Sequence, residues 1–165
     1  MPAYPPPAFE QKICSRAQLA QRIAALPRPL VFTNGCFDIL HRGHATYLAQ
    51  ARSLGASMIV GVNSDASVKH QGKGDDRPIN CEADRLALLA ALEAVSLVTL
   101  FEEDTPLNLI LACHPEVLVK GGDWAADAIV GSREVLAWGG SVHSIPFLHQ
   151  RSTTATLTKI RNTLG

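Results

Sequence analysis

The stretch LVFTNGCFDILHRGH, residues 30–44, decides how this chain folds. Its first residues, LVF at 30–32, form an apolar run typical of a buried strand, and TNG at 33–35 ends that run with residues that favour turns. From residue 43 onward, apolar side chains recur at helical spacing in GHATYLAQARSL. The stretch therefore predicts a strand, then a glycine-containing loop, then the start of a helix.

Two histidines, His41 and His44, stand where this helix is expected to begin. A helix start offers unpaired backbone N–H groups and the positive end of a dipole, so phosphate is the expected ligand there. A purely structural role for each ring and a zinc site are the alternatives, but the pair lacks a convincing third zinc ligand. The sequence therefore favours a phosphate site and predicts no metal held by protein side chains.

Strands and helices are predicted to alternate along the rest of the chain. Short aliphatic runs predict strands at residues 30–32, 57–62, 96–101, 116–120 and 141–146, and helical patterns cover residues 15–26, 81–94, 105–114, 127–138 and 152–164. Ser15 with Gln18 is expected to cap the first helix, and Asn80 the helix at 81–94. Residues 66–79 are predicted to be a polar loop.

This order of elements predicts an α/β fold: a Rossmann-like, doubly wound, five-stranded parallel sheet. Residues 1–14 are predicted to be a proline-rich N-terminal tail, and residues 15–165 a single domain.

The composition is that of a globular protein with an aliphatic core, with 47% apolar and 5% aromatic residues. The 15 basic and 15 acidic residues balance to a formal net charge of zero, so neither nucleic acid nor a membrane is expected as a partner. The four cysteines show no C-x-x-C spacing, and no signal peptide or bilayer-length apolar run is found. These features predict a cytoplasmic location.

Polar segments follow four of the predicted strands, at residues 34–44, 63–77, 120–123 and 149–154. In doubly wound sheets, ligands bind outside the carboxyl ends of the strands, so these segments are expected to meet at one edge. The sequence has no G-x-x-x-x-G-K-[ST] motif and no G-x-G-x-x-G after the first strand, which argues against P-loop and dinucleotide-fingerprint sites.

The order of these motifs resembles that of the cytidylyltransferase-like nucleotidyltransferases. The resemblance rests on NGCFDILHRGH at residues 34–44, Lys73 before RP at 77–78, VKGGDW at 119–124 and STT at 152–154. FEEDTP at 101–106 and LVKGGD at 118–123 resemble the branch of the family that joins ATP to D-glycero-β-D-manno-heptose 1-phosphate. In many relatives this domain is fused to a sugar kinase, whereas this chain resembles the stand-alone version.

The resemblance implies roles for individual residues, in three groups. The catalytic residues are His41, His44 and Lys73. The nucleotide-binding residues are Thr33, Asn34, Gly35, Cys36, Phe37, Gly43, Gly121, Gly122, Asp123, Ser152, Thr153 and Thr154. The residues that bind the second substrate are Asp38, Asn63, Asp65, Arg77 and Lys120.

Alternatives stay open in the loop that carries the lysine. Lys69 is a second candidate for closing over the phosphates, although the spacing to the Arg-Pro pair favours Lys73. Arg77 either grips a sugar phosphate or pairs with Asp75 or Asp76.

Other positions also have two interpretations. Asp38 either orients a histidine, contacts the acceptor through a bridging ion or turns the chain, and Trp124 either stacks on the substrates or packs against the sheet. Gln150 and Arg151 stand where relatives have glycine and a small apolar residue, and Arg151 is itself a candidate for a phosphate contact. One residue of the STT segment is expected to cap the last helix.

The resemblance implies in-line attack of the acceptor phosphate on the α-phosphorus of ATP. The products are ADP-heptose, a precursor of the lipopolysaccharide inner core, and pyrophosphate, with Mg²⁺ bound mainly through the ATP phosphates. A separate heptose kinase would act upstream, and the sequence leaves a homodimer undecided. The alternatives are a cytidylyltransferase that uses CTP and an alcohol phosphate such as glycerol 3-phosphate, and a non-catalytic nucleotide-binding regulator. A tRNA synthetase fragment is the weakest alternative, because this chain is short, has no net charge and lacks a K-M-S-K-S element.

Overall fold

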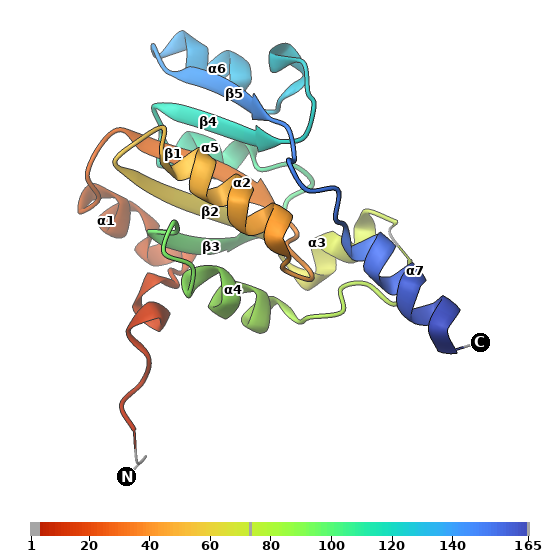
Figure 1. Ribbon diagram of the computed structural model, residues 1–165. Coiled ribbons are helices and arrows are strands. Elements are labelled where there is room, and N and C mark those ends of the chain that lie inside the picture. The colour runs from red at the N-terminus through yellow and green to blue at the C-terminus, as the bar shows by residue number, and fades with distance from the viewer. Residues whose placement is uncertain (1–3, 73, 165) are drawn as a thin grey trace.

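The computed structural model describes residues 4–72 and 74–164. In these ranges one sheet is formed by β1 (Leu30–Gly35), β2 (Ser57–Asn63), β3 (Leu97–Phe101), β4 (Val117–Gly121) and β5 (Ser141–Ile145). The strand order is β3-β2-β1-β4-β5, and every neighbouring pair is parallel (Figure 1). The predicted doubly wound α/β fold is confirmed.

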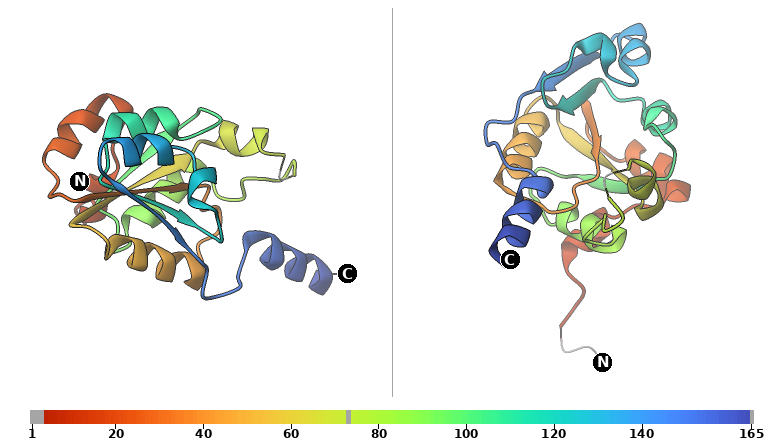
Figure 2. Two further views of the ribbon diagram at one scale, coloured as in Figure 1. Left: turned by 90° about the horizontal axis from the view of Figure 1, so that it is seen from above. Right: turned by 90° about the vertical axis from the view of Figure 1, so that its right-hand side faces the viewer.

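Helices cover both faces of the sheet because alternate strand residues point to opposite sides. Val31 packs in the core cluster with residues of α2 (Arg42–Arg52) and α4 (Glu82–Ala90). Its neighbours Leu30 and Phe32 pack in a second cluster with α1 (Leu19–Ala24), α5 (Leu107–Cys113) and α6 (Ser132–Ala137). Figure 2 shows the two helical layers edge on. The near-continuous apolar strands are therefore explained by burial on both faces.

The position of β1 in the middle of the sheet determines where a ligand can bind. The chain goes from β1 outward to β2 and β3, and later returns to add β4 and β5 on the other side of β1. The loops that follow β1 and β4 consequently diverge and leave a crevice at their carboxyl ends.

The structure corrects the prediction that residues 66–79 are all loop. Helix α3 (Asp65–His70) follows β2 directly, and the hydroxyl of Ser64 accepts a hydrogen bond from the N–H of Ser67. This serine cap was the local signal for the helix, but it lies among polar residues with little apolar periodicity.

Two further helix predictions need correction. The helix expected at 127–138 is divided into the 3-10 helix η3 (Ala126–Ala128) and α6, because Gly131 adopts a φ of 86° between them. Helix α4 ends at Ala90 rather than 94, and its N-cap is Cys81, because the Asn80 side chain instead donates a hydrogen bond to the Asp38 carbonyl.

The N-terminal segment contacts the sheet before the predicted boundary at residue 14. The 3-10 helix η1 (Ala8–Lys12) leads to a parallel bridge between Ile13 and Val98, and Cys14 is buried. The capping box expected at Ser15 does not form, because its hydroxyl meets the Gln18 side chain at the 3-10 helix η2 (Arg16–Gln18) rather than a helix N–H group. The division of the chain at this point stays a prediction.

At the other end, α7 (Thr153–Leu164) follows an extended segment and projects away from the sheet (Figures 1 and 2). In the described part of the chain, no helix is both long enough and apolar enough to cross a membrane.

Candidate functional site

Three neighbouring cavities open at the carboxyl ends of the strands. The first, of about 270 Å³, is here called the histidine cavity and is lined by Cys36, Phe37, Asp38, His41, His44, Arg77, Phe147, Arg151, Ser152, Thr153 and Thr154. The second, also about 270 Å³, is called the asparagine cavity and is lined by Asn34, Gly35, Cys36, Asn63, Gln71, Phe101, Asp104, Thr105, Pro106, Lys120 and Val130. The third, of about 160 Å³, is called the aromatic cavity and is lined by Asn34, Gly35, Cys36, Phe37, His44, Tyr47, Lys120, Gly121 and Phe147.

The two histidines form a stacked pair at the start of α2. Their ring centroids are 3.9 Å apart with an angle of 20° between the planes, and the Phe37 ring meets His44 edge-on at 5.3 Å. Among the described residues, the Nδ1 atoms of both rings are buried without a hydrogen-bond partner. Buried polar atoms without partners are costly and are typical of sites that a ligand completes.

The surroundings keep both rings neutral near pH 7. Burial is the largest effect and the neighbouring His41 the second, and together they lower the pKa of His44 to about 4 against an opposing effect of the Ile39 backbone. Burial and then the Arg151 guanidinium lower the pKa of His41. In the ligand-free protein, the rings are therefore N–H donors without a net charge.

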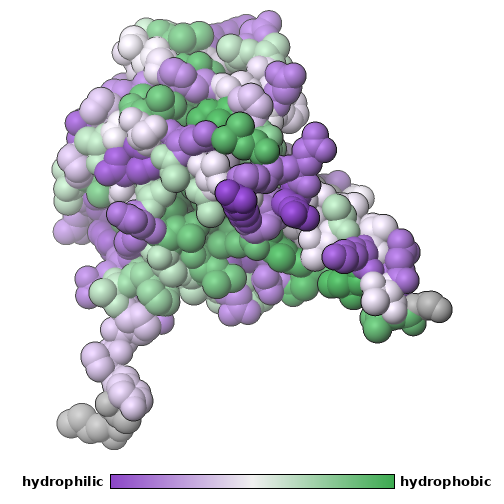
Figure 3. All heavy atoms as spheres, in the orientation of Figure 1, coloured by the Kyte–Doolittle hydropathy of each residue, from purple (hydrophilic) through white to green (hydrophobic). Residues whose placement is uncertain are grey.

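Gly43 allows this stacking. A Cβ atom at this position would lie 2.9 Å from Cε1 of His41 and 3.2 Å from the carbonyl oxygen of His149. The glycine thus lets the segment before α7 approach the start of α2, and this approach brings the two halves of the histidine cavity together. Figure 3 shows hydrophilic residues gathered over this junction.

Asp38 and Arg77 form a buried ion pair. The Arg77 Nε atom lies 2.5 Å from a carboxylate oxygen of Asp38, and the side chains are 7% and 0% exposed respectively. The backbone N–H groups of Ile79 and Asn80 also donate to this carboxylate, and they and Arg77 outweigh burial and lower the pKa of Asp38. Arg77 therefore pairs with Asp38 and not with Asp75 or Asp76, and the roles predicted for both residues in binding the acceptor stay predictions.

Arg85 supports the loop between β1 and α2, and no sequence motif pointed to it. Its side chain is fully buried and donates to the backbone carbonyls of Cys36, at 2.7 Å, and Asn80, at 3.1 Å. It also pairs with Asp65 at 2.9 Å, and the role predicted for Asp65 in binding the acceptor stays a prediction. Its position, four residues before Leu89, is on the buried face of α4, but arginine is rarely fully buried, so only the structure reveals its burial.

Tyr47 was also missed, because in the sequence it is one of the apolar residues of α2. Its hydroxyl is buried and forms a 2.5 Å hydrogen bond with the Thr33 hydroxyl. Burial raises the pKa of Tyr47 to about 12. Thr33 is fully buried within β1, where it pairs with Val60, and it lines none of the three cavities, so its predicted nucleotide contact stays a prediction.

The two glycines at the end of β4, Gly121 and Gly122, allow aromatic side chains to approach closely. A Cβ atom at Gly121 would lie 2.7 Å from the Phe147 ring, and one at Gly122 would lie 2.8 Å from Trp124 Nε1. Trp124 is 49% exposed and its indole N–H donates to the Gly121 carbonyl. Asp123 is exposed and lines none of the three cavities.

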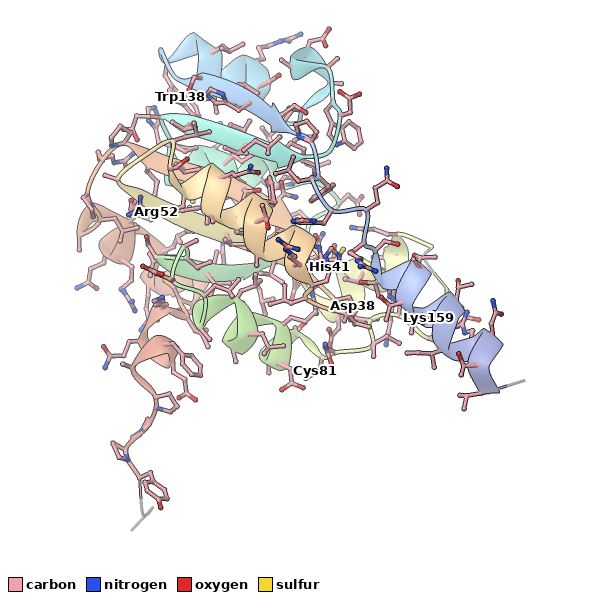
Figure 4. The ribbon with its side chains drawn as sticks, in the orientation of Figure 1. Asp38, His41, Arg52, Cys81, Trp138 and Lys159 are labelled. Carbon is pink, nitrogen blue, oxygen red and sulfur yellow. The ribbon has the colours of Figure 1, made fainter. Side chains whose placement is uncertain are left out.

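The start of α7 forms the outer wall of the histidine cavity. Ser152 accepts a hydrogen bond from the N–H of Ala155 at 3.0 Å, so it is the residue that caps the helix. Thr153 is buried, while Thr154 and Arg151 are exposed. Figure 4 shows Asp38 and His41 on the side of the molecule from which α7 leaves.

The structure thus brings most of the predicted residues to one edge, and it leaves their roles as predictions. Asn34, Gly35, Cys36, Asn63 and Lys120 line the asparagine cavity. Lys73 lies outside the described residues, while Lys69 is exposed in the last turn of α3.

Comparison with known proteins agrees with this arrangement. Residues 32–161 match the family profile described as cytidylyltransferase-like. The chain belongs to this family. A protein named D-beta-D-heptose 1-phosphate adenylyltransferase from Bordetella bronchiseptica is 58% identical over 155 residues, which cover 93% of this chain and 96% of that protein. The bifunctional protein HldE of Trichlorobacter lovleyi is 49% identical over 92% of this chain, which covers 31% of the length of HldE.

Solved structures give the same fold. The lipopolysaccharide core biosynthesis protein from Thermoplasma volcanium matches 74% of this chain and 98% of its own, with a TM-score of 0.59 and 27% identity. Pantothenate synthetase from Thermus thermophilus matches 81% of this chain and 61% of its own, with a TM-score of 0.56 and 19% identity, which indicates the fold alone.

Proposed function

We propose that this chain is an adenylyltransferase that joins ATP to D-glycero-β-D-manno-heptose 1-phosphate and releases pyrophosphate. The 58% identity to the Bordetella heptose 1-phosphate adenylyltransferase, over nearly the whole of both chains, is the observation that carries this proposal. The product, ADP-heptose, would serve as a precursor of the lipopolysaccharide inner core.

The reaction needs positioning and charge stabilisation rather than a covalent intermediate. An oxygen of the acceptor phosphate forms a bond to the α-phosphorus of ATP while the bond to the bridging oxygen breaks, and the electron pair leaves with pyrophosphate. In this proposal the backbone of residues 33–37 holds the α-phosphate next to the start of α2. Arg85, through the Cys36 carbonyl, and Asp38, through the chain at residues 79–80, fix this loop in position before ATP binds.

The histidine pair would stabilise the charge that develops on the phosphoryl oxygens. Because their pKa values are lowered, both imidazoles enter as neutral N–H donors, and a bound triphosphate would favour their protonation. Lys73 would add a mobile ammonium group, and Ser152, Thr153 and Thr154 would hold the departing pyrophosphate at the start of α7.

Mg²⁺ is proposed to bind mainly through the triphosphate. The donor set fits this mode, because the buried Asp38 carboxylate is already occupied by Arg77 and two backbone N–H groups. Mg²⁺ keeps several waters and takes few protein ligands when phosphates are available. It would neutralise part of the phosphate charge.

The partners follow from this chemistry. A separate heptose kinase is proposed to supply the sugar 1-phosphate, since HldE, of which this chain matches 31%, is named bifunctional. A cytoplasmic location is proposed on the basis of the need for ATP and of four cysteines that show no C-x-x-C spacing.

Pyrophosphate release, measured for ATP and CTP against heptose 1-phosphate and glycerol 3-phosphate, tests the function. The proposal expects release with ATP and heptose 1-phosphate and a new phosphorus NMR signal for a diphosphate linkage. Release only with CTP and glycerol 3-phosphate would instead assign the cytidylyltransferase alternative. ATP binding by calorimetry without turnover of any pair would point to a regulator.

A further inference from the structure

The asparagine cavity adjoins the histidine cavity at Cys36, which follows β1. Both cavities include Cys36 in their walls, and the asparagine cavity also includes Asn34 and Gly35. Its other walls come from the carboxyl ends of β2, β3 and β4 and from the segment between β3 and α5. A ligand in this cavity would therefore lie next to the segment that is proposed to hold the α-phosphate.

The charges of the two cavities differ. In the histidine cavity the Asp38–Arg77 pair is neutral overall, which leaves Arg151 and two imidazoles for an anion. Among the described residues, the charged groups that line the asparagine cavity are Lys120 and Asp104. A triphosphate is better matched by the first cavity, and a monophosphate ester with a neutral polar body by the second.

The remaining lining of the asparagine cavity has the chemistry of a carbohydrate site. Phe101 and Pro106 are buried and provide an apolar floor. Around them stand amide, hydroxyl and carboxylate groups from Asn63, Gln71, Thr105 and Asp104. A sugar has apolar C–H faces and a rim of hydroxyl groups, and a carboxylate can accept two hydroxyl hydrogen bonds at once.

Some of these polar groups are already positioned by the protein. The Asn63 amide donates to the Ser67 hydroxyl at 2.9 Å, and the Cys36 thiol donates to the Gln71 side-chain oxygen at 3.4 Å. Asp104 and Thr105, by contrast, are exposed beside the mouth of the cavity. They can therefore turn toward a ligand without breaking a buried contact.

We infer that the asparagine cavity holds the sugar of the acceptor and that Asp104 selects for its hydroxyl groups, with Lys120 on the phosphate. The inference rests on the proposed function and names the residues that distinguish a sugar 1-phosphate from a smaller alcohol phosphate. The triphosphate of the nucleotide is assigned to the histidine cavity.

The test compares Asp104→Ala with Glu102→Ala, which removes the same charge from an exposed residue of the same segment outside the cavity. Because Asp104→Ala removes a carboxylate that would accept hydrogen bonds from the sugar, it should raise KM for heptose 1-phosphate by roughly 10- to 100-fold. KM for ATP should stay within about twofold, and Glu102→Ala should match the parent protein. An equal rise in both KM values, or no rise for the sugar phosphate, would overturn the inference.

A panel of monodeoxy sugar 1-phosphates tests the hydroxyl contact. At least one analogue should bind the parent protein more weakly than the full sugar, yet bind Asp104→Ala as well as the full sugar does. If every analogue loses the same factor in both proteins, Asp104 does not contact a hydroxyl group and the inference fails.

Calorimetry separates failure of the inference from failure of the proposed function. If heptose 1-phosphate binds the full chain, Asp104→Ala weakens that binding and no nucleotide is turned over, then the cavity assignment holds and the proposed reaction is wrong. If the parent protein turns over heptose 1-phosphate but Asp104→Ala has unchanged affinity for it, the reaction holds and the cavity assignment is wrong. If the parent protein does not bind the sugar phosphate at all, both are wrong.

Discussion

The two walls of the histidine cavity are built in opposite ways. The loop between β1 and α2 is held from within by a buried ion pair and a fully buried arginine, Arg85. The wall formed by α7 has one buried residue, Thr153, and its Arg161 side chain reaches an exposed ion pair with Asp76. The contrast shows that the loop is fixed by buried contacts within the protein, whereas α7 is mostly exposed.

The largest expected effect comes from removing the anchor of the first wall. Asp38→Ala leaves the Arg77 guanidinium buried without its partner, which should lower the free energy of unfolding by about 3–5 kcal/mol. Urea unfolding followed by circular dichroism measures this loss. A change below about 1 kcal/mol would mean that the pair does not anchor the loop.

The next largest effect is expected on turnover, when a histidine at the start of α2 is removed. His44→Ala should lower turnover by about a hundredfold or more, the scale for losing one preorganised donor in the transition state. Single-turnover pyrophosphate release measures it, and His143→Ala on β5, outside the three cavities, is the matched control. Parent-like release from a folded His44→Ala protein would remove this histidine from the mechanism.

Lys73→Ala should lower turnover by roughly tenfold or more with little change in thermal stability, because its ammonium group would act only on bound phosphate. Lys69→Ala, tested beside it, decides between the two lysines. Loss of turnover in Lys69→Ala alone would transfer the role to α3.

The free energy of unfolding of the protein should depend on pH through His44. Since the pKa of His44 is lowered to about 4 from an ordinary value of 6.5, the unfolded chain binds more protons than the folded protein between these values. The free energy of unfolding should therefore fall as the pH falls through this window. In His44→Gln the loss between pH 7 and 5 should be smaller, as measured by urea midpoints, whereas an unchanged loss would place its origin elsewhere.

The smallest effect is expected from the second wall. Arg161→Ala breaks an ion pair whose side chains are 65% and 47% exposed, so the free energy of unfolding should change by less than about 1 kcal/mol. A loss as large as that of Asp38→Ala would erase the contrast between the two walls.

The chain alone determined the sheet and the edge that carries the site. Aliphatic runs followed by turn residues mark each strand, and the glycine and histidines after β1 mark a helix start suited to phosphate, because these signals are local in sequence. Only the tertiary structure decided which charged side chains have partners within the protein. Asp38 meets Arg77 across 39 positions, and Arg85 reaches the Cys36 carbonyl across 49. No local pattern encodes such pairings, since they depend on how β1, α4 and the intervening loop pack together.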